Sequence, residues 1–112
     1  MLHLTLRQLK VFESVARHLS YSRAADELHL TQPAVSMQIK QLEDNINLPL
    51  FEQLGKRIFL TEAGQELYQY SRAISQQLAD LEVALDELKG MERGKLNISV
   101  VTTANYFAPH LL

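Results

Sequence analysis

The chain of 112 residues is long enough for one small domain and an appendage, since domains commonly run to about 100 to 150 residues. It contains no Cys, which excludes disulfides, thiolate zinc sites and a cysteine nucleophile, and its four His residues lack the spacing of metal ligands. The net charge is −2, and the chain has no basic tail of the kind typical of nucleic-acid binding. The two halves differ, with a charge of +1 through Leu60 and −3 from Thr61 onward.

No run of 18 or more apolar residues is present, and the N-terminus lacks the pattern of a signal peptide. We therefore expect no membrane span and a cytoplasmic protein. The sequence also lacks paired carboxylates, a nucleophile with a neighbouring base, and a glycine-rich phosphate loop. We expect no catalytic residues, no bound metal and no cofactor.

The first predicted helix begins after Thr5. Thr5 and Gln8 have the spacing of a capping box, and Leu4 and Leu9 have that of a hydrophobic staple. Apolar residues then recur at helical spacing, which predicts an inward face made of Leu9, Phe12, Ala16 and Leu19.

Two short amphipathic helices follow, and they predict a helix-turn-helix motif from Tyr21 to Lys40. Ser20 can cap the first of them, whose inward residues are Ala24, Ala25 and Leu28. His29 stands in the turn, where Gly is often found in this motif. Thr31 can cap the second helix, and Pro33 is tolerated in its first turn.

The second of these helices has one apolar stripe and one polar face. At about 100° per residue, the stripe predicted to be buried consists of Val35, Ile39, Leu42 and Ile46. In a helix-turn-helix, the second helix enters the major groove with its N-terminus first. The candidate DNA-binding residues are therefore Gln32, Pro33, Ser36, Met37 and Lys40.

A hairpin is predicted next. Asn45 or Asn47 can take the left-handed conformation that ends a helix, and two β-like runs follow at residues 50–53 and 57–60, with residues 54–56 as the turn. Beside a helix-turn-helix, we interpret this hairpin as a wing rather than a merely solvated turn. Its tip residues, Lys56 and Arg57, suit contact with phosphate or the minor groove.

Thr61 can cap a long helix that contains no Pro and that we expect to end near Lys89. Seven positions along it recur at alternating spacings of four and three: Leu67, Ser71, Ile74, Leu78, Leu81, Leu85 and Leu88. Such a seam favours a partner helix over packing on the chain's own core. We therefore predict that the helix dimerises through the Leu and Ile residues of the seam.

Beyond Gly90 the pattern changes. Residues 95–101, KLNISVV, have the composition of a buried strand, and a polar turn follows at residues 102–105. We interpret this as the first strand of a domain that 112 residues cannot complete, and we expect the chain to be a fragment.

These parts occur in the order found in LysR-type transcriptional regulators, which the chain resembles from Leu4 to Gly90. The resemblance is carried by Leu9, Phe12 and Glu43, and by the motifs SYSRAADEL (20–28), TQPAVSMQIKQL (31–42), PLFE (49–52) and LTEAG (60–64). The stretches SMQIKQLE and LFEQLGKRIFLTEAG are further similar to the subgroup that controls carbon-fixation operons of autotrophs.

The resemblance implies a mainly α fold with three parts: a winged helix-turn-helix DNA-binding domain (4–61), a linker helix that pairs in a dimer (62–90), and the start of an α/β effector-binding domain (91–112). It also implies a homodimer or homotetramer on double-stranded DNA with an inverted-repeat operator, controlled by a small-molecule effector. Thr102 and Thr103 match the polar turn that often contacts the effector in this family.

Three positions depart from the family pattern. Met37 stands where Arg is frequent, Gln53 where Arg often follows the Phe-Glu pair, and Asn47 where Gly is usual. The first two remove cations, and Met37 would suit a thymine methyl instead. From the residues alone two other classes stay open: a coiled-coil adaptor whose function lies in the long helix, and an enzyme.

Overall fold

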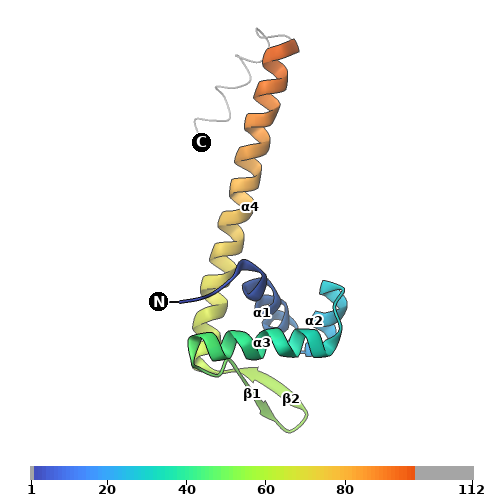
Figure 1. Cartoon of the computed structure of the whole chain (residues 1–112), viewed down its shortest axis with the longest axis vertical. Helices are drawn as coiled ribbons and strands as arrows, with labels where there is room; N and C mark the ends of the chain where they lie inside the picture. The colour runs from blue at the N-terminus through green and yellow to red at the C-terminus, as the bar shows by residue number, and fades with distance from the viewer. Residues whose placement is uncertain (1, 98–112) are drawn as a thin grey trace. The chain divides into compact units, whose positions relative to one another are not determined.

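The computed structural model describes the backbone of residues 2–97 and the side chains of residues 2–91. Its elements are α1 (Leu6–His18), α2 (Tyr21–Leu28), α3 (Gln32–Ile46), β1 (Phe51–Leu54), β2 (Arg57–Leu60) and α4 (Glu62–Asn97) (Figure 1). Residues up to Ser75 form a compact first unit, called the head below, and Gln76 begins a second unit. The predicted order of helices and hairpin is confirmed, whereas Thr102 and Thr103 lie outside the described residues.

The four predicted N-terminal caps are all present. Thr5 forms the complete capping box with Gln8, in which each side chain bonds the other residue's backbone N–H. The hydroxyl oxygens of Ser20, Thr31 and Thr61 each accept a hydrogen bond from the backbone N–H three residues on, over 3.0 to 3.2 Å. Each helix of the head therefore begins where its sequence supplies a side-chain acceptor for an otherwise unpaired N–H group.

Each of α1, α2 and α3 is followed by a residue in the left-handed conformation, and none of these three residues is glycine. Leu19, His29 and Asn47 have φ values of 49°, 58° and 63°. His29 therefore takes the conformation for which this turn often uses Gly. The expectation that Leu19 continues the inward face of α1 is wrong, because the helix ends at His18 and the left-handed turn leaves Leu19 exposed.

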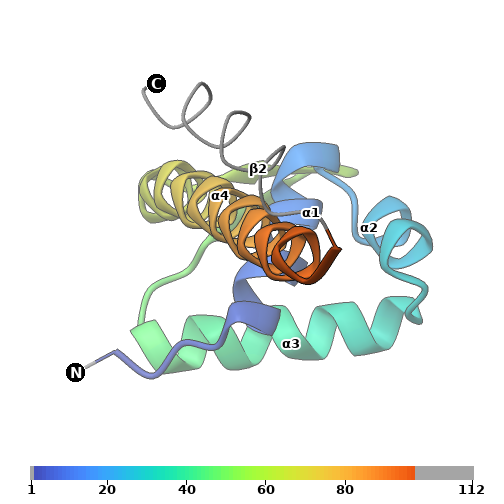
Figure 2. The ribbon, with the colours of Figure 1, turned by 90° about the horizontal axis from the view of Figure 1, so that it is seen from above.

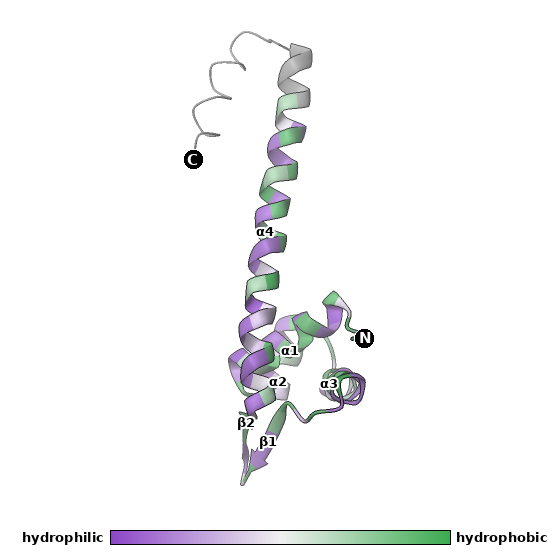
Figure 3. Ribbon diagram, turned by 90° about the vertical axis from the view of Figure 1, so that its left-hand side faces the viewer, coloured by the Kyte–Doolittle hydropathy of each residue, from purple (hydrophilic) through white to green (hydrophobic). Residues whose placement is uncertain are grey.

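The core of the head lies where α1 packs against α2 and α3, and α2 packs against α3 (Figure 2). The adjacent Ala24 and Ala25 are buried at these crossings. In Figure 3 hydrophilic and hydrophobic segments alternate along α4, as expected for a helix with apolar and polar sides. The other buried hydrophobic residues of the core are Leu9, Val11, Phe12, Val15, Ala16, Val35, Ile39, Leu42 and Leu50.

The wing is a two-stranded antiparallel hairpin in which Phe51 pairs with Leu60 and Leu54 pairs with Arg57. Its first strand is one residue later than predicted, and the turn contains only Gly55 and Lys56. Gly55 has a φ of 65°, whereas Lys56 is not among the residues with positive φ. A glycine with positive φ at the first turn position joins two strands in two residues, so Leu54 belongs to the ladder.

The first turn of α4 packs closely on the strand that begins the wing. Gly64 is buried, and a Cβ atom at this position would clash with the backbone carbonyl oxygen of Leu50 and would lie 2.9 Å from Leu60 Cδ2. Ala63, Leu67 and Tyr68 pack against the core. The start of α4 is thus part of the head.

The far end of α4 differs from the prediction. The helix continues through Gly90 to Asn97, so the expected end at Lys89 is wrong, and residues 95–97 are helical rather than the start of a strand. One glycine inside a helix costs only about 1 kcal/mol, and Leu88, Lys89, Met91 and Glu92 around it are good helix formers. The remainder of the predicted strand lies outside the described residues. Within residues 2–97, no helix combines the length and apolarity needed to cross a membrane.

Candidate nucleic-acid interface

The N-terminal part of α3 presents its predicted reading face to solvent. Gln32, Pro33, Ser36, Met37 and Lys40 are all exposed, and Met37 is 58% exposed. On the opposite side Val35, Ile39 and Leu42 are buried. The apolar stripe therefore fixes which side of α3 faces outward, as the helical spacing predicts.

An ion pair that the sequence pattern does not reveal joins α1 to α2. Both guanidinium nitrogens of Arg17 donate to the carboxylate of Glu27, over 2.6 and 2.9 Å, and the buried Ser14 hydroxyl donates to the same carboxylate over 2.6 Å. These hydrogen bonds from Arg17 and Ser14 lower the pKa of Glu27 to about 2. Arg17 and Ser14 lie ten and thirteen residues before Glu27, so local sequence spacing does not predict these contacts.

The wing is anchored at its root by aromatic packing. The ring of Phe51 lies 5.4 Å from that of Phe12 in α1, and 6.0 Å from that of Tyr21 in α2, between ring centroids. Ile58 and Leu60 also pack against the core. The tip residues Lys56 and Arg57 remain exposed, as predicted.

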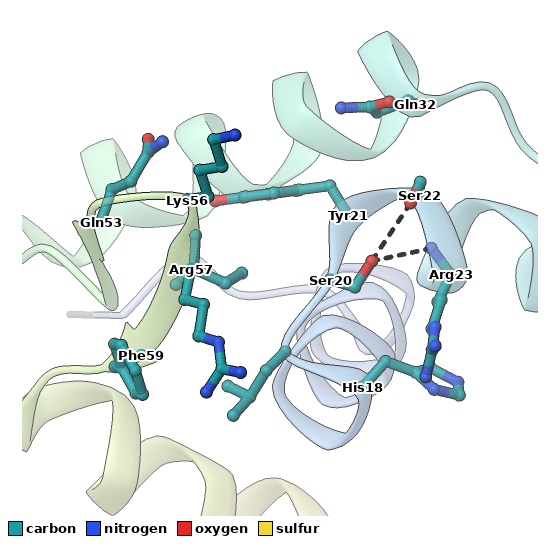
Figure 4. A pocket seen from close by; sticks show the side chains of 12 residues that line it. His18, Ser20, Tyr21, Ser22, Arg23, Gln32, Gln53, Lys56, Arg57 and Phe59 are labelled. Carbon is teal, nitrogen blue, oxygen red and sulfur yellow. Dashed lines mark hydrogen bonds between the residues drawn. The ribbon is translucent and has the colours of Figure 1, made fainter.

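A groove of about 730 Å³ separates the wing from the start of α2 (Figure 4). Arg23, Lys56 and Arg57 bring three cations to it, and its lining contains no carboxylate. In Figure 4 the Tyr21 side chain extends from α2 toward the wing. The groove is lined by His18, Leu19, Ser20, Tyr21, Ser22, Arg23, Gln32, Gln53, Lys56, Arg57, Ile58 and Phe59.

Electrostatics and hydrogen bonds define the α2 side of this groove. Burial raises the pKa of the Tyr21 phenol, and the negative charge of Glu43 raises it further, so the phenol stays protonated and can donate. The Ser20 hydroxyl lies 3.2 Å from that of Ser22 and accepts from the Arg23 N–H. A cationic groove with neutral hydroxyl donors suits an anionic strand.

The structure brings only part of the predicted set into the groove. Gln32, Lys56 and Arg57 line it, whereas Pro33, Ser36, Met37 and Lys40 lie on the exposed face of α3 outside its lining. The hydroxyl and cationic residues at the start of α2, Ser20 to Arg23, are not among the residues predicted to contact DNA, although the predicted helix-turn-helix motif begins at Tyr21. Their signal in the sequence is the polar first turn of a helix that precedes a reading helix.

A family model described as "Bacterial regulatory helix-turn-helix protein, lysR family" matches residues 6–65. This chain belongs to the LysR family. It is 63% identical, over 111 residues, to a "RuBisCO operon transcriptional regulator" of Allochromatium vinosum, covering 99% of this chain and 37% of that protein. It is 56% identical to the "HTH-type transcriptional regulator CbbR" of Rhodospirillum rubrum, covering 96% and 36%.

Both relatives are therefore matched over little more than a third of their length. The predicted resemblance to LysR regulators, and to those of carbon-fixation operons, is confirmed. Solved LysR structures confirm the winged helix-turn-helix fold with its long helix. The DNA-binding domain of BenM with benA site 1 DNA has a TM-score of 0.73 at 28% identity, covering 77% of this chain and 97% of that one. The corresponding CbnR complex has a TM-score of 0.67 at 31% identity, covering 78% and 99%.

The departures from the LysR pattern have visible local consequences. Asn47 adopts the left-handed conformation that Gly usually supplies, and it ends α3. The Gln53 amide donates to the Gly55 carbonyl over 3.3 Å. Gln53 thus uses a donor within the wing at the position where Arg is frequent in the family.

The apolar seam of α4 divides into two parts. Leu67 packs against the core of its own head, and Ser71 is buried there. The Ser75 hydroxyl donates to the Glu13 carboxylate, over 3.1 and 3.2 Å to its two oxygens, which also ties α4 to α1. Ile74, just before this contact, is 39% exposed. Beyond the contact Leu78 is half-buried, whereas Leu81, Leu85 and Leu88 are between 46% and 53% exposed.

Proposed function

We propose that this chain binds DNA sequence-specifically, as the DNA-binding head and dimerisation helix of a LysR-type transcriptional regulator. The observation that carries the proposal is the exposed polar face of α3 beside a cationic groove and wing. Support comes from the BenM and CbnR domains, whose structures contain DNA. We assign DNA binding to residues 4–61, dimerisation to residues 62–90, which lie within α4, and the start of an effector domain to residues 91–112.

Within this assignment, Gln32, Ser36 and Met37 read base edges, with Pro33 at the rim of the reading face. Lys40 and the wing residues Lys56 and Arg57 contact phosphates. Met37 is suited to the methyl group of thymine, because its side chain is apolar and well exposed. We assign the groove lined by Lys56 and Arg57 to the backbone of one DNA strand.

For the regulator as a whole, we propose a homodimer or homotetramer that controls a carbon-fixation operon. The names of the Allochromatium vinosum and Rhodospirillum rubrum relatives support this target. A small-molecule effector would act through the effector-binding domain, in which we propose that Thr102 and Thr103 contact it. The proposed role requires access to the chromosome and therefore a cytoplasmic location, and it involves no catalysis.

The proposal is tested by selection from a pool of random-sequence duplexes. The purified chain is incubated with the pool, and the retained DNA is sequenced. We expect enrichment of one motif arranged as an inverted repeat, because a two-fold dimer presents its two reading helices in opposite orientations. Retention without any enriched motif would contradict sequence-specific binding and would favour an adaptor role for α4.

A further inference from the structure

We propose that Glu43 is a positioning residue for the wing, whose carboxylate holds the hairpin where Lys56 and Arg57 can reach DNA phosphates. The inference rests on the proposed DNA-binding function of the head. It assigns a role in binding to a residue that need not itself touch DNA.

Glu43 accepts hydrogen bonds from the end of α3 and from the segment that leads into β1. Its backbone carbonyl accepts from the N–H groups of Asn47 and Leu48, over 2.7 and 3.3 Å, where α3 ends. Its carboxylate Oε2 accepts from the Leu50 N–H over 2.8 Å in a half-buried position. One residue of the reading helix therefore fixes both the end of α3 and the residue directly before β1.

Leu50 is the point at which the wing meets the rest of the head. Its side chain is fully buried, and its carbonyl accepts from the Thr61 N–H over 3.0 Å, one step beyond the Phe51 and Leu60 pair. The Thr61 hydroxyl also donates to the Pro49 carbonyl over 2.6 Å. The wing root is thus bonded to α3 through Glu43, and to the start of α4 through Thr61.

The negative charge of Glu43 also affects a side chain at the wing root. Its negative charge contributes to the raised pKa of Tyr21, whose ring packs against Phe51 in an edge contact. Phe51 is the first residue of β1. The negative charge of Glu43 therefore acts on the Tyr21 phenol as well as on the Leu50 amide.

The length of the wing makes its tip sensitive to the root. A strand of four residues spans about 14 Å at roughly 3.4 Å per residue. A rotation of about 10° at Leu50 would then move the tip by about 2.4 Å, which is enough to break a hydrogen bond with a heavy-atom distance near 3 Å. Loss of the Glu43 acceptor should therefore cost the contacts of Lys56 while leaving the reading face of α3 in place.

The experiment compares two neutral replacements. Glu43→Gln keeps a side-chain oxygen that can accept from the Leu50 N–H, whereas Glu43→Met has similar length and no comparable acceptor. Because both remove one negative charge, their difference isolates the hydrogen bond. Lys56→Ala is added to the wild type and to each variant, and binding is measured with a duplex that the wild-type chain selects from a random pool.

The readout is the ratio of the dissociation constants at about 200 and 50 mM salt. Each phosphate contact raises this ratio by about 3.5-fold, from a slope of about 0.9 per contact. A dimer carries two copies of Lys56, so we expect Lys56→Ala to lower the ratio by about 12-fold in the wild type and in Glu43→Gln, but by less than about 4-fold in Glu43→Met. An equal decrease in all three backgrounds overturns the inference, and so does the absence of any decrease in the wild type.

Should Glu43→Met fail to fold, Glu43→Asp provides the second test. Its carboxylate keeps the charge but is one methylene shorter, so the wing root must shift or lose its bond. The effect of Lys56→Ala should then be smaller than in the wild type, and an undiminished effect overturns the inference. Failure of the wild-type chain to select any duplex contradicts the proposed function itself, and is thereby distinguishable from failure of the role given to Glu43.

Discussion

Glu27 is a residue whose ionisation should contribute to the acid stability of the head. Its pKa is lowered from 4.5 to about 2 by the hydrogen bonds from Arg17 and Ser14, so the folded state favours the ionised form. The resulting stabilisation is complete above a pH of about 4.5, and it is lost as the pH falls toward about 2. Between a pH of about 5 and about 2.5, the melting temperature should therefore fall further in the wild type than in Glu27→Gln.

Circular dichroism melts across this pH range make the comparison. Glu66→Gln, which changes an exposed carboxylate on α4, serves as the control and should follow the wild type. Parallel curves for the wild type and Glu27→Gln would show that the ion pair contributes no pH-dependent stability.

Gly64 is a second residue with a defined energetic role. A methyl group at this position meets the Leu50 carbonyl, and a backbone atom cannot move aside as the end of a flexible side chain can. We expect Gly64→Ala to destabilise the head by about 1 to 3 kcal/mol, as overpacking does. Gly90→Ala is the matched control, because nothing lies within 4 Å of a Cβ atom there and Ala is the better helix former. Urea unfolding measures the free energy of unfolding of both variants. Equal values for Gly64→Ala and Gly90→Ala would exclude a close-packing role for Gly64.

At the scale of the elements, the sequence predicts those features that depend on neighbouring residues, such as helix caps and buried faces. The caps at Thr5, Ser20, Thr31 and Thr61 and the buried stripe of α3 are local properties, and the structure has them where they are expected. The contacts between elements are not local. Neither the groove nor the Leu50–Glu43 hydrogen bond follows from helical spacing. The groove depends on how segments far apart in the sequence pack, and the hydrogen bond depends on the path of the chain between α3 and β1.

Two of the mistaken boundaries, at Leu19 and near Gly90, have different local causes. Leu19 fits an apolar pattern, but the chain turns left-handed there, and apolar spacing carries no information about φ. At the end of α4, Gly90 is a weak breaker among strong helix formers, so propensity over the whole window outweighs a single glycine. The packing of Leu67 and Ser71 on the head was likewise not predicted, because a heptad pattern does not state which surface covers it.

The reading face of α3 yields a prediction about base preference. Gln32→Ala should reduce discrimination at one base pair per half-site, by roughly 1 to 3 kcal/mol, since a lost base contact costs about that much. Gln41→Ala is the control, because Gln41 is exposed on the C-terminal half of the same helix. Binding to a series of operator variants provides the measurement. Unchanged preferences in Gln32→Ala would move the reading role to other residues of α3.

At the scale of the whole molecule, the exposed part of the α4 seam predicts a dimer. Burying a Leu side chain contributes about 1.5 to 3 kcal/mol, and Leu81, Leu85 and Leu88 are each about half exposed in one chain. Replacing Leu81 and Leu85 by Lys should therefore give monomers that keep a folded head and bind the operator far more weakly. Val83→Lys is the matched control, since Val83 is also exposed but lies off the seam.

Sedimentation equilibrium measures the outcome for all of these chains. The unmodified chain and Val83→Lys should be dimers, and the double Lys variant should not. A monomeric unmodified chain at tens of micromolar would contradict pairing through α4.

The left-handed residues that end α1 and α2 bear on how such a head can diverge. An ordinary side chain in this region costs roughly 1 to 2 kcal/mol, and glycine avoids that cost, although it also increases the freedom of the unfolded chain. Leu19 and His29 are both exposed, and neither belongs to the reading face of α3. Glycine at either position would make the head more stable, and this added stability would offset the cost of destabilising substitutions on α3. Operator choice could thus drift between lineages without loss of the fold.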